Sequence, residues 1–322
     1  MTVAGLSTNG EILRGVYPES LDTARDKLRR TAQNDMGKLR IYLEMIKFEH
    51  SIFALPFAYM AAILARLKLP DWAALFWITV AMVGARTLAM SLNRLIDKEI
   101  DASNPRTKNR ALPQKLLSEK DVILFSLLAL GILVFAAYQL APLTRLLWPL
   151  VVIPFVVYPY TKRFTWTSHF LLGACLGLAP IGAWIAVTNS LALVPILIGL
   201  AVTLWVAGFD IIYACQDVEI DRSQKLSSIP ARFRIKTALS ITKILHLFSI
   251  ALFIYIGYLS HLGIIYYAGL ALVAGLLAYE NYLVRSDDLS KLDLAFFNMN
   301  GIISVTLFAF TFVDLLLKKV IS

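Results

Sequence analysis

The chain has 322 residues, of which 58% are hydrophobic and 16% are charged, and its mean hydropathy is +0.67. Soluble domains are about 45–50% apolar and about 25% charged, so this composition excludes an ordinary soluble enzyme, a disordered chain and a disulfide scaffold. Lys and Arg outnumber Asp and Glu by 31 to 22. No nucleic-acid-binding module accompanies this charge, and the long apolar runs indicate an integral membrane protein.

The first 40 residues are polar and contain no apolar core of a signal peptide. We assign residues 1–40 to a cytoplasmic N-terminal segment and residues 41–322 to one membrane domain. Residues 20–47 are predicted to form a basic amphipathic helix on the inner leaflet, where anionic lipid attracts it. For residues 1–20, a partly disordered tail is an equal alternative.

The rest of the chain is divided into apolar runs long enough to cross a bilayer. A hydrocarbon core of about 30 Å needs about 20 apolar residues in one helix, and continuous rather than alternating runs favour helices over strands. We therefore expect an all-α bundle of about nine transmembrane helices. The runs lie at residues 51–67, 72–92, 121–141, 146–160, 169–188, 191–215, 238–260, 262–283 and 295–317. The fourth run is short and contains three prolines.

The positions of Lys and Arg predict the orientation in the membrane. With the N-terminus in the cytoplasm, 25 of the 31 basic residues lie on the inner side, and five lie outside. The protein is therefore predicted to be a multi-pass protein of the plasma (inner) membrane. Its N-terminus is expected in the cytoplasm and its C-terminus outside.

Two similar acidic motifs follow the second and sixth predicted spans. The first reads NRLIDKEID and the second reads YACQDVEID, and each precedes a basic segment. This similarity predicts a duplicated helix-plus-loop unit. The polar residues recur at intervals of four: Asn93, Asp97 and Asp101 in the first motif, and Tyr213, Asp217 and Asp221 in the second.

The paired aspartates predict a magnesium site. A spacing of four places the two carboxylates of each motif on one helix face, where they repel each other unless a cation compensates them. Mg²⁺ binds through a few carboxylates together with substrate phosphates. The predicted metal ligands are Asp97, Asp101, Asp217 and Asp221. The alternative is two solvated helix ends, neutralised by Lys98 or Arg94.

Basic residues lie beside both motifs. Carboxylates and cations at one membrane face favour a diphosphate held by metal and cations together. The candidate cations are Arg106, Lys108, Arg110, Lys162 and Arg163.

Arg86 lies deep inside the second predicted span, two helical turns before Asn93. An arginine that faces lipid is unfavourable, so Arg86 is expected to face the bundle interior and bind an anion. The anion is either a substrate carboxylate or Asp210, which lies two turns before Asp217. A purely structural Arg86–Asp210 pair remains an alternative.

The histidines give weaker signals. His50, at the entrance to the first span, is a candidate substrate contact, whereas His169, His246 and His261 are interpreted as interfacial or packing residues. No His/Cys metal-binding spacing and no Gly-rich phosphate loop occur in the sequence.

The two acidic motifs, together with RTxxR and YPxxKR, resemble the UbiA superfamily of intramembrane aromatic prenyltransferases over nearly the whole chain from about residue 40. The stretches KFEHSIFALPFA, GLAPIGAWIAVT and SSIPARF resemble its menaquinone-pathway members of the futalosine route. Those members are often labelled 4-hydroxybenzoate polyprenyltransferases and are thought to prenylate a dihydroxynaphthoate. Typical hydroxybenzoate enzymes read VKSTA where this chain has LSSIPA, which removes a lysine at Ser227.

The resemblance implies a nine-helix bundle around a central cavity, with a side portal that opens to membrane lipid for a long prenyl tail. It implies the transfer of a polyprenyl group from polyprenyl diphosphate to a hydroxylated aromatic carboxylate in respiratory quinone biosynthesis, most closely that of menaquinone. Mg²⁺ is the implied cofactor. The implied metal–diphosphate residues are Asn93, Asp97, Asp101, Asp217 and Asp221, and the implied phosphate clamp is Arg106, Arg110, Lys162 and Arg163.

Within such a reaction, Asp210 or Tyr213 is a candidate to hold the phenol or accept a proton, and Arg86 is a candidate to hold the acceptor's carboxylate. Alternatives within the enzyme class are 4-hydroxybenzoate prenylation for ubiquinone and prenylation of haem or chlorophyll, although no loop indicates a site for those larger acceptors. A membrane transporter is the alternative from another class. A transporter predicts ionisable residues near the bilayer midplane, whereas these carboxylates cluster at one edge.

Overall fold

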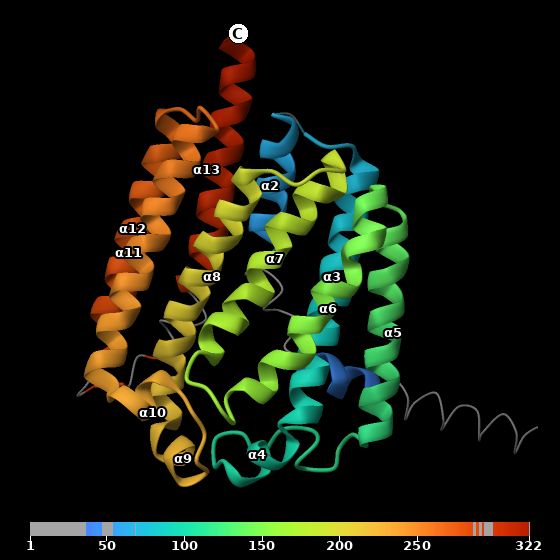
Figure 1. The fold of residues 1–322 in the computed structure, drawn as a ribbon, viewed down its shortest axis with the longest axis vertical. Helices are drawn as coiled ribbons and strands as arrows, with labels where there is room; N and C mark the ends of the chain where they lie inside the picture. The colour runs from blue at the N-terminus through green and yellow to red at the C-terminus, as the bar shows by residue number, and fades with distance from the viewer. Residues whose placement is uncertain are drawn as a thin grey trace, which may run out of the picture.

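A computed structural model describes residues 37–46, 54–67, 69–285, 288–289, 292 and 299–321 of the chain. These residues form helices and connecting loops without a β-strand, which confirms the predicted all-α class. The long helices lie side by side in one bundle (Figure 1). Eight of the described helices are long and apolar enough to cross a membrane.

Each of these eight helices coincides with a predicted apolar run. They are α3 (Trp72–Ile96), α5 (Glu119–Tyr138), α6 (Pro142–Thr161), α7 (Ser168–Thr188), α8 (Leu193–Ala214), α11 (Ile235–Leu259), α12 (Ile264–Leu283) and α13 (Asn300–Ile321). The first predicted run contains α2 (Leu55–Arg66), which has 12 residues. Residues 51–53 of that run, like His50, lie outside the described residues.

The fourth membrane helix is longer than the sequence predicts. Helix α6 begins at Pro142 rather than at residue 146 and continues to Thr161, with Pro149, Pro154 and Pro159 inside it. A proline at the first helical position costs no hydrogen bond. Interior prolines are tolerated in membrane helices because neighbouring helices and local adjustments satisfy the freed carbonyl groups. The three prolines therefore did not mark the ends of this span.

Helices α7 and α8 approach each other closely through glycines. A Cβ atom on Gly173 would lie 2.3 Å from the Thr203 carbonyl oxygen, and one on Gly177 would lie 2.4 Å from the Gly199 carbonyl oxygen. Small residues at a membrane-helix interface allow such backbone contact. This packing brings the first turns of α7 beside the last turns of α8, where the polar residues of both helices lie.

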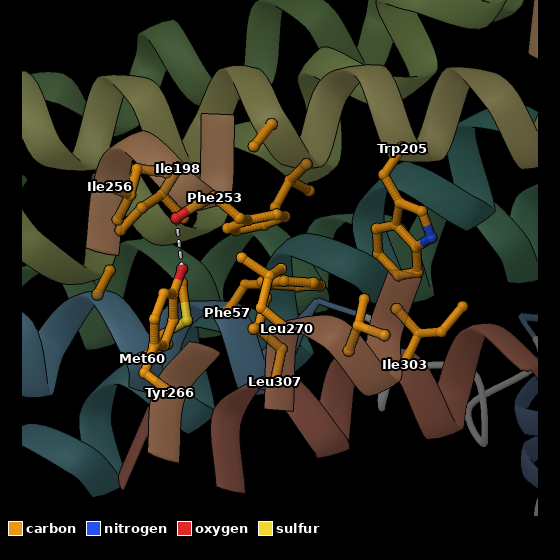
Figure 2. Packing of buried hydrophobic residues seen from close by; sticks show 14 of the residues in the cluster. Phe57, Met60, Ile198, Trp205, Phe253, Ile256, Tyr266, Leu270, Ile303 and Leu307 are labelled. Atoms are coloured by element: carbon orange, nitrogen blue, oxygen red, sulfur yellow. Dashed lines mark hydrogen bonds between the residues drawn. The ribbon is translucent and has the colours of Figure 1, made fainter. Parts of the chain in front are cut away.

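On another side, α8 packs into an apolar core with α2, α11, α12 and α13 (Figure 2). Phe57, Trp205 and Phe253 form aromatic contacts there, and the Tyr266 hydroxyl donates a hydrogen bond to the Phe253 carbonyl at 2.7 Å. Trp205 is only 1% exposed, so this face of α8 is fixed in the core. The polar residues Asp210 and Tyr213 of α8 do not belong to this core.

Residues 37–45 form a helix that contacts the bundle. The Tyr42 hydroxyl lies 2.6 Å from the Ser91 hydroxyl of α3, and Lys38 Nζ donates to Asp121 of α5 at 3.0 Å. This helix belongs to the predicted amphipathic segment and runs across the predicted domain boundary at residue 40. That boundary stays a prediction, and residues 1–36 lie outside the described part of the chain.

Candidate active site

The two acidic motifs fold in the same way. Asp97 lies between α3 and the short helix α4 (Lys98–Ser103), and Asp217 lies between α8, extended by the 3₁₀ turn η2 (Cys215–Asp217), and α9 (Val218–Ser223). The backbone angles are φ −94° and ψ 4° at Asp97, and φ −103° and ψ 7° at Asp217. Both short helices lie at the same end of the bundle (Figure 1). This shared geometry supports the predicted duplication.

A polar cavity of about 740 Å³ lies between the two motifs. Its lining includes most of the predicted site residues: Arg86, Asn93, Asp97, Asp101, Arg106, Arg110, Lys162, Asp210, Tyr213, Asp217 and Asp221. Arg163 lies beside the cavity, where its Nη2 donates to the Ile96 carbonyl at 2.8 Å and lies 3.7 Å from Asp97 Oδ1. Lys108 is exposed and does not line the cavity.

Asp97 is 2% exposed and accepts hydrogen bonds from two residues. Lys162 Nζ donates to its Oδ2 at 2.6 Å, and the Asn93 amide donates to the same oxygen at 2.9 Å. The contact between Asn93 and Asp97 shows the expected spacing of four on one helix face. Burial raises the pKa of the Asp97 carboxyl, whereas the charge and hydrogen bond of Lys162 act in the opposite direction.

Asp101 and Asp217 are each paired with an arginine of the loop after α4. Arg110 Nη1 contacts both oxygens of Asp101, at 2.7 and 2.8 Å. Arg106 donates to Asp217 Oδ1 through Nε at 3.0 Å and to Oδ2 through Nη2 at 2.5 Å. Its Nη1 also donates to the Tyr213 hydroxyl at 2.7 Å. The first loop therefore supplies the cation for the carboxylate of the second motif.

Burial by itself lowers the pKa of Arg106, but its contacts with Asp217, Tyr213 and Asp101 together raise that pKa above its ordinary value. Asp221 differs from the other three aspartates, because its hydrogen-bond donor is the neutral hydroxyl of Ser228 at 2.6 Å. Ser228 is also the N-cap of α10 (Ile229–Phe233).

The alternative in which Lys98 or Arg94 neutralises the aspartates is wrong. Lys98 Nζ instead pairs with Glu119 at 2.7 Å. Arg94 donates to the side-chain oxygen of Asn93 at 3.1 Å and to the Met45 carbonyl at 3.4 Å. The cations that compensate Asp97 and Asp217 lie 65 and 111 residues away in the sequence, so two solvated helix ends do not describe this site.

The donor atoms of the four aspartates fit Mg²⁺. Among the described residues, no group of three or more Asp, Glu, His or Cys side chains stands close enough together to hold a metal ion by itself. Mg²⁺ does not need such a cage, because it keeps several waters and binds through one or two carboxylates plus substrate phosphates. Carboxylates distributed over two sides of one cavity therefore suit a metal that binds together with a diphosphate.

A second group of polar residues lies deeper in the cavity. Asp210 precedes Asp217 by two turns of α8, which places it about 10 Å further into the bundle, and Arg86 precedes Asn93 in α3 in the same way. Asp210 Oδ2 lies 2.6 Å from His169 Nδ1 of α7, and the amide N–H of Ile229 donates to His169 Nε2 at 3.3 Å. We call Arg86, His169 and Asp210 the inner layer, and the four motif aspartates with their cations the outer layer.

Sequence reasoning missed three residues of this site. Asn104 donates to Asp217 at 3.0 Å, Ser228 donates to Asp221, and His169 contacts Asp210. The sequence alone suggests only an interfacial or packing role for His169. The signal that could have identified it is Asp210, because an aspartate inside an apolar span needs a polar partner. Which residue supplies that partner depends on the packing of α7 on α8, which spacing along the chain does not reveal.

An apolar cavity of about 290 Å³ adjoins the polar one and lies among α3, α5, α6 and α7. Its residues include Ala81, Leu133, Phe155 and Ile181. The two cavities share the lining residues Arg86, Met90, Tyr158, Leu172 and Leu176. The polar cavity therefore suits the charged head of a ligand, and the adjoining apolar cavity suits a long apolar tail.

Solved structures of similar fold span nearly the whole bundle. The apo structure of a UbiA homologue from Aeropyrum pernix K1 has a TM-score of 0.76 and 33% sequence identity, and the match covers 83% of this chain and 98% of that chain. A UbiA homologue from Archaeoglobus fulgidus, whose structure contains DMAPP and Mg²⁺, has a TM-score of 0.67 at 19% identity, with 85% of this chain and 98% of that chain covered.

Sequence relatives lead to the same family. A protein of Saccharophagus degradans named 4-hydroxybenzoate octaprenyltransferase is 30% identical over 255 residues, which cover 79% of this chain and 83% of that protein. A protein of the same name from Vibrio atlanticus is 29% identical over 238 residues, or 74% of this chain and 84% of that protein. The model of the UbiA prenyltransferase family matches residues 54–302. This match covers most of the chain, the bundle is shared with the solved structures, and both acidic motifs surround one cavity. The chain therefore belongs to the UbiA prenyltransferase family.

Proposed function

We propose that the protein transfers a polyprenyl group from polyprenyl diphosphate to a ring carbon of a hydroxylated aromatic carboxylate and releases diphosphate. The observation that carries this proposal is the arrangement of both acidic motifs and the three cations Arg106, Arg110 and Lys162 around one cavity that continues into an apolar one. A hydroxybenzoate is the acceptor best supported by the relatives, which are named 4-hydroxybenzoate octaprenyltransferases.

A dihydroxynaphthoate is the second candidate acceptor, as in menaquinone biosynthesis. The observation that favours it is the sequence LSSIPA at residues 226–231, where typical hydroxybenzoate enzymes have a lysine. Ser227 lines the polar cavity, and its backbone N–H donates to the Lys162 carbonyl at 2.6 Å. A serine at this position leaves more room for a two-ring acceptor than a lysine.

The cations of the outer layer bind the diphosphate by changing partners. Arg106, Arg110 and Lys162 each neutralise one aspartate in the structure. When the diphosphate enters, its oxygens offer these cations charge-assisted hydrogen bonds, and arginine forks suit phosphate geometry. The aspartates are then free to hold Mg²⁺, whose positive charge supports the departure of diphosphate. The ligands that this assigns are Asp97, Asp101, Asp217 and Asp221.

The inner layer holds the aromatic acceptor. Arg86 binds the acceptor's carboxylate, and Asp210 or Tyr213 contacts the phenol or accepts a proton. The prenyl tail occupies the apolar cavity, and the allylic carbon lies where the two cavities meet. Tyr158 and Phe209 line the polar cavity and shield the developing allylic charge through their ring faces.

The membrane orientation belongs to the same proposal. The motif loops and the short helices α4, α9 and α10 lie at one end of the bundle (Figure 1). The loops and helix ends on this side carry most of the basic residues that the structure describes. The positive-inside rule assigns this end, and with it the cavity and the N-terminus, to the cytoplasmic side of the plasma (inner) membrane.

Product analysis of the purified protein tests the proposed function. The protein receives Mg²⁺, a polyprenyl diphosphate, and 4-hydroxybenzoate and a dihydroxynaphthoate in equal concentration, and mass spectrometry identifies the prenylated product. We expect one prenylated acid. It should form while Mg²⁺ is present, stop forming when a chelator is added, and form again when Mg²⁺ is restored. A purified protein that forms neither product would contradict the proposal and leave the transporter as the alternative.

A further inference from the structure

We propose that His169 is a positioning residue for prenyl transfer, which fixes the carboxylate of Asp210 so that its Oδ1 atom takes the proton from the acceptor ring. This inference rests on the proposed function and adds a residue to it. His169 is 3% exposed and lies in the first turn of α7, at the boundary between that helix and the polar cavity.

The hydrogen bonds of His169 determine which ring nitrogen carries the proton. The backbone N–H of Ile229 can only donate, so Nε2, at 3.3 Å from it, acts as an acceptor and is not protonated. Nδ1 therefore carries the proton and donates it to Asp210 Oδ2 at 2.6 Å. Only the neutral tautomer with hydrogen on Nδ1 satisfies both contacts.

This arrangement leaves the two oxygens of Asp210 in different roles. Oδ2 is held by His169, whereas Oδ1 accepts no hydrogen bond from the residues that the structure describes. The Asp210 side chain is 23% exposed and lines the polar cavity. Because the terminal torsion of an aspartate is broad and two-fold, a carboxylate without this bond turns easily. The contact with His169 therefore fixes the carboxylate and leaves Oδ1 as the oxygen that can accept from a ligand in the cavity.

His169 also connects the inner layer to the outer layer. Its acceptor bond is to the first residue of α10, and the preceding residue, Ser228, donates to Asp221 at 2.6 Å. The N-terminal end of α10 is thus attached to the outer-layer carboxylate through Ser228 and to the histidine that orients Asp210 through Ile229. The two layers are held in register across α7, α8 and α10.

In the reaction, the C–O bond to the diphosphate breaks and its electron pair leaves with the diphosphate. A π electron pair of the acceptor ring forms the new C–C bond to the prenyl carbon. The proton on the substituted ring carbon passes to Asp210 Oδ1, and the electron pair of the broken C–H bond restores the aromatic ring. The proton is then released from Asp210 to water. His169 stays neutral throughout and holds the carboxylate in place.

Three substitutions at His169 test this role. His169→Asn places an amide N–H near the position of Nδ1 and keeps a donor for Asp210, whereas His169→Gln places its amide near Nε2 and His169→Leu offers neither. We expect kcat to fall at least ~10-fold in the Leu and Gln variants, with the KM for polyprenyl diphosphate nearly unchanged, and to recover substantially in the Asn variant. His246→Asn is the matched control, because His246 is equally buried at 3% but lines neither cavity.

Two further measurements separate positioning from folding. In an Asp210→Asn background, adding His169→Leu is expected to cause no further loss of kcat, because both changes disable the same group. With a ring-deuterated acceptor, the isotope effect on kcat is expected to be larger in His169→Leu than in the wild-type protein, since proton removal becomes slower.

Equal losses in all three His169 variants, additive losses with Asp210→Asn, or an unchanged isotope effect would each overturn this assignment in favour of a structural role for His169. Failure of the proposed function itself is distinguishable, because the wild-type protein would then form no prenylated product.

Discussion

Asp97 and Asp217 stand at equivalent junctions, with backbone angles within about ten degrees of each other, although they lie 120 residues apart. Each ends a membrane helix and begins a six-residue helix that carries a second aspartate four positions later. The loop of the first motif supplies the cation of the second, because Arg106 follows the first motif but pairs with Asp217. The two motifs therefore form one site rather than two.

The planar guanidinium of Arg106, and not only its charge, should contribute to the binding of polyprenyl diphosphate. Arg106→Lys keeps a positive charge but loses the two-atom contact with Asp217 and the bond to Tyr213. We expect the KM for polyprenyl diphosphate to rise about tenfold, which corresponds to about 1.4 kcal/mol of binding. Steady-state kinetics with varied donor and saturating acceptor measure this change. The same substitution at exposed Arg40, which pairs with Glu44 on the surface, is the control.

The roles of Asp210 and Tyr213 in proton transfer are distinguished by replacing each with a side chain of similar shape that lacks the carboxylate or the hydroxyl. If Asp210 accepts the ring proton, Asp210→Asn lowers kcat at least ~100-fold, the usual contribution of a general base. Tyr213→Phe removes only the hydroxyl that accepts from Arg106 and should lower kcat much less. The reverse order of the two kcat values would assign the proton transfer to Tyr213.

Arg86 is expected to recognise the acceptor's carboxylate. Arg86→Ala should reduce kcat/KM more with 4-hydroxybenzoate than with phenol, which lacks the carboxylate, because a charged hydrogen-bonded pair is lost only in the first case. Parallel assays with the two acceptors measure the ratio. Equal losses would instead indicate that Arg86 supports the structure of the bundle.

The close contact of α7 with α8 gives a prediction for stability. Gly173→Ala would place a methyl group 2.3 Å from a backbone oxygen of α8, so the helices must separate at a cost of about 1–3 kcal/mol. Gly182→Ala in the same helix meets no atom within 4 Å and should leave stability nearly unchanged. Thermal unfolding in one detergent compares the two variants. Equal melting temperatures would contradict the close packing that brings His169 to Asp210.

The orientation can be measured with single cysteines, because the native Cys175 and Cys215 are both buried. Lys108 is exposed in the loop after α4, and His261 is exposed in the loop between α11 and α12. These two loops lie at opposite ends of the bundle (Figure 1). In intact cells, a membrane-impermeant maleimide should label His261→Cys but label Lys108→Cys only after permeabilisation. The opposite pattern would place the active site outside.

Much of the fold could be predicted because membrane helices are visible as apolar runs of fixed length. Eight spans appear where the sequence places them, whereas α6 begins at Pro142, before the predicted start at residue 146. The two acidic motifs were equally visible, because they repeat.

The partners within the site could not be predicted in the same way. The contacts of Asp217 with Arg106, of Asp221 with Ser228, and of Asp210 with His169 join different helices or loops. Such pairs depend on how the helices pack, and in particular on the glycines between α7 and α8. Spacing along the chain predicted only neighbours on the same helix, such as Asn93 and Asp97.

The central claim is that both acidic motifs act together in prenyl transfer. The most direct measurement is the rate of prenylated-acid formation by purified Asp97→Asn and Asp217→Asn, with Mg²⁺, polyprenyl diphosphate and the preferred acceptor. Asp71→Asn is the control, because Asp71 is exposed and its side chain makes no cap hydrogen bond at the start of α3. We predict a loss of at least ~100-fold in each motif variant and none in the control. Full activity in either motif variant would contradict the account.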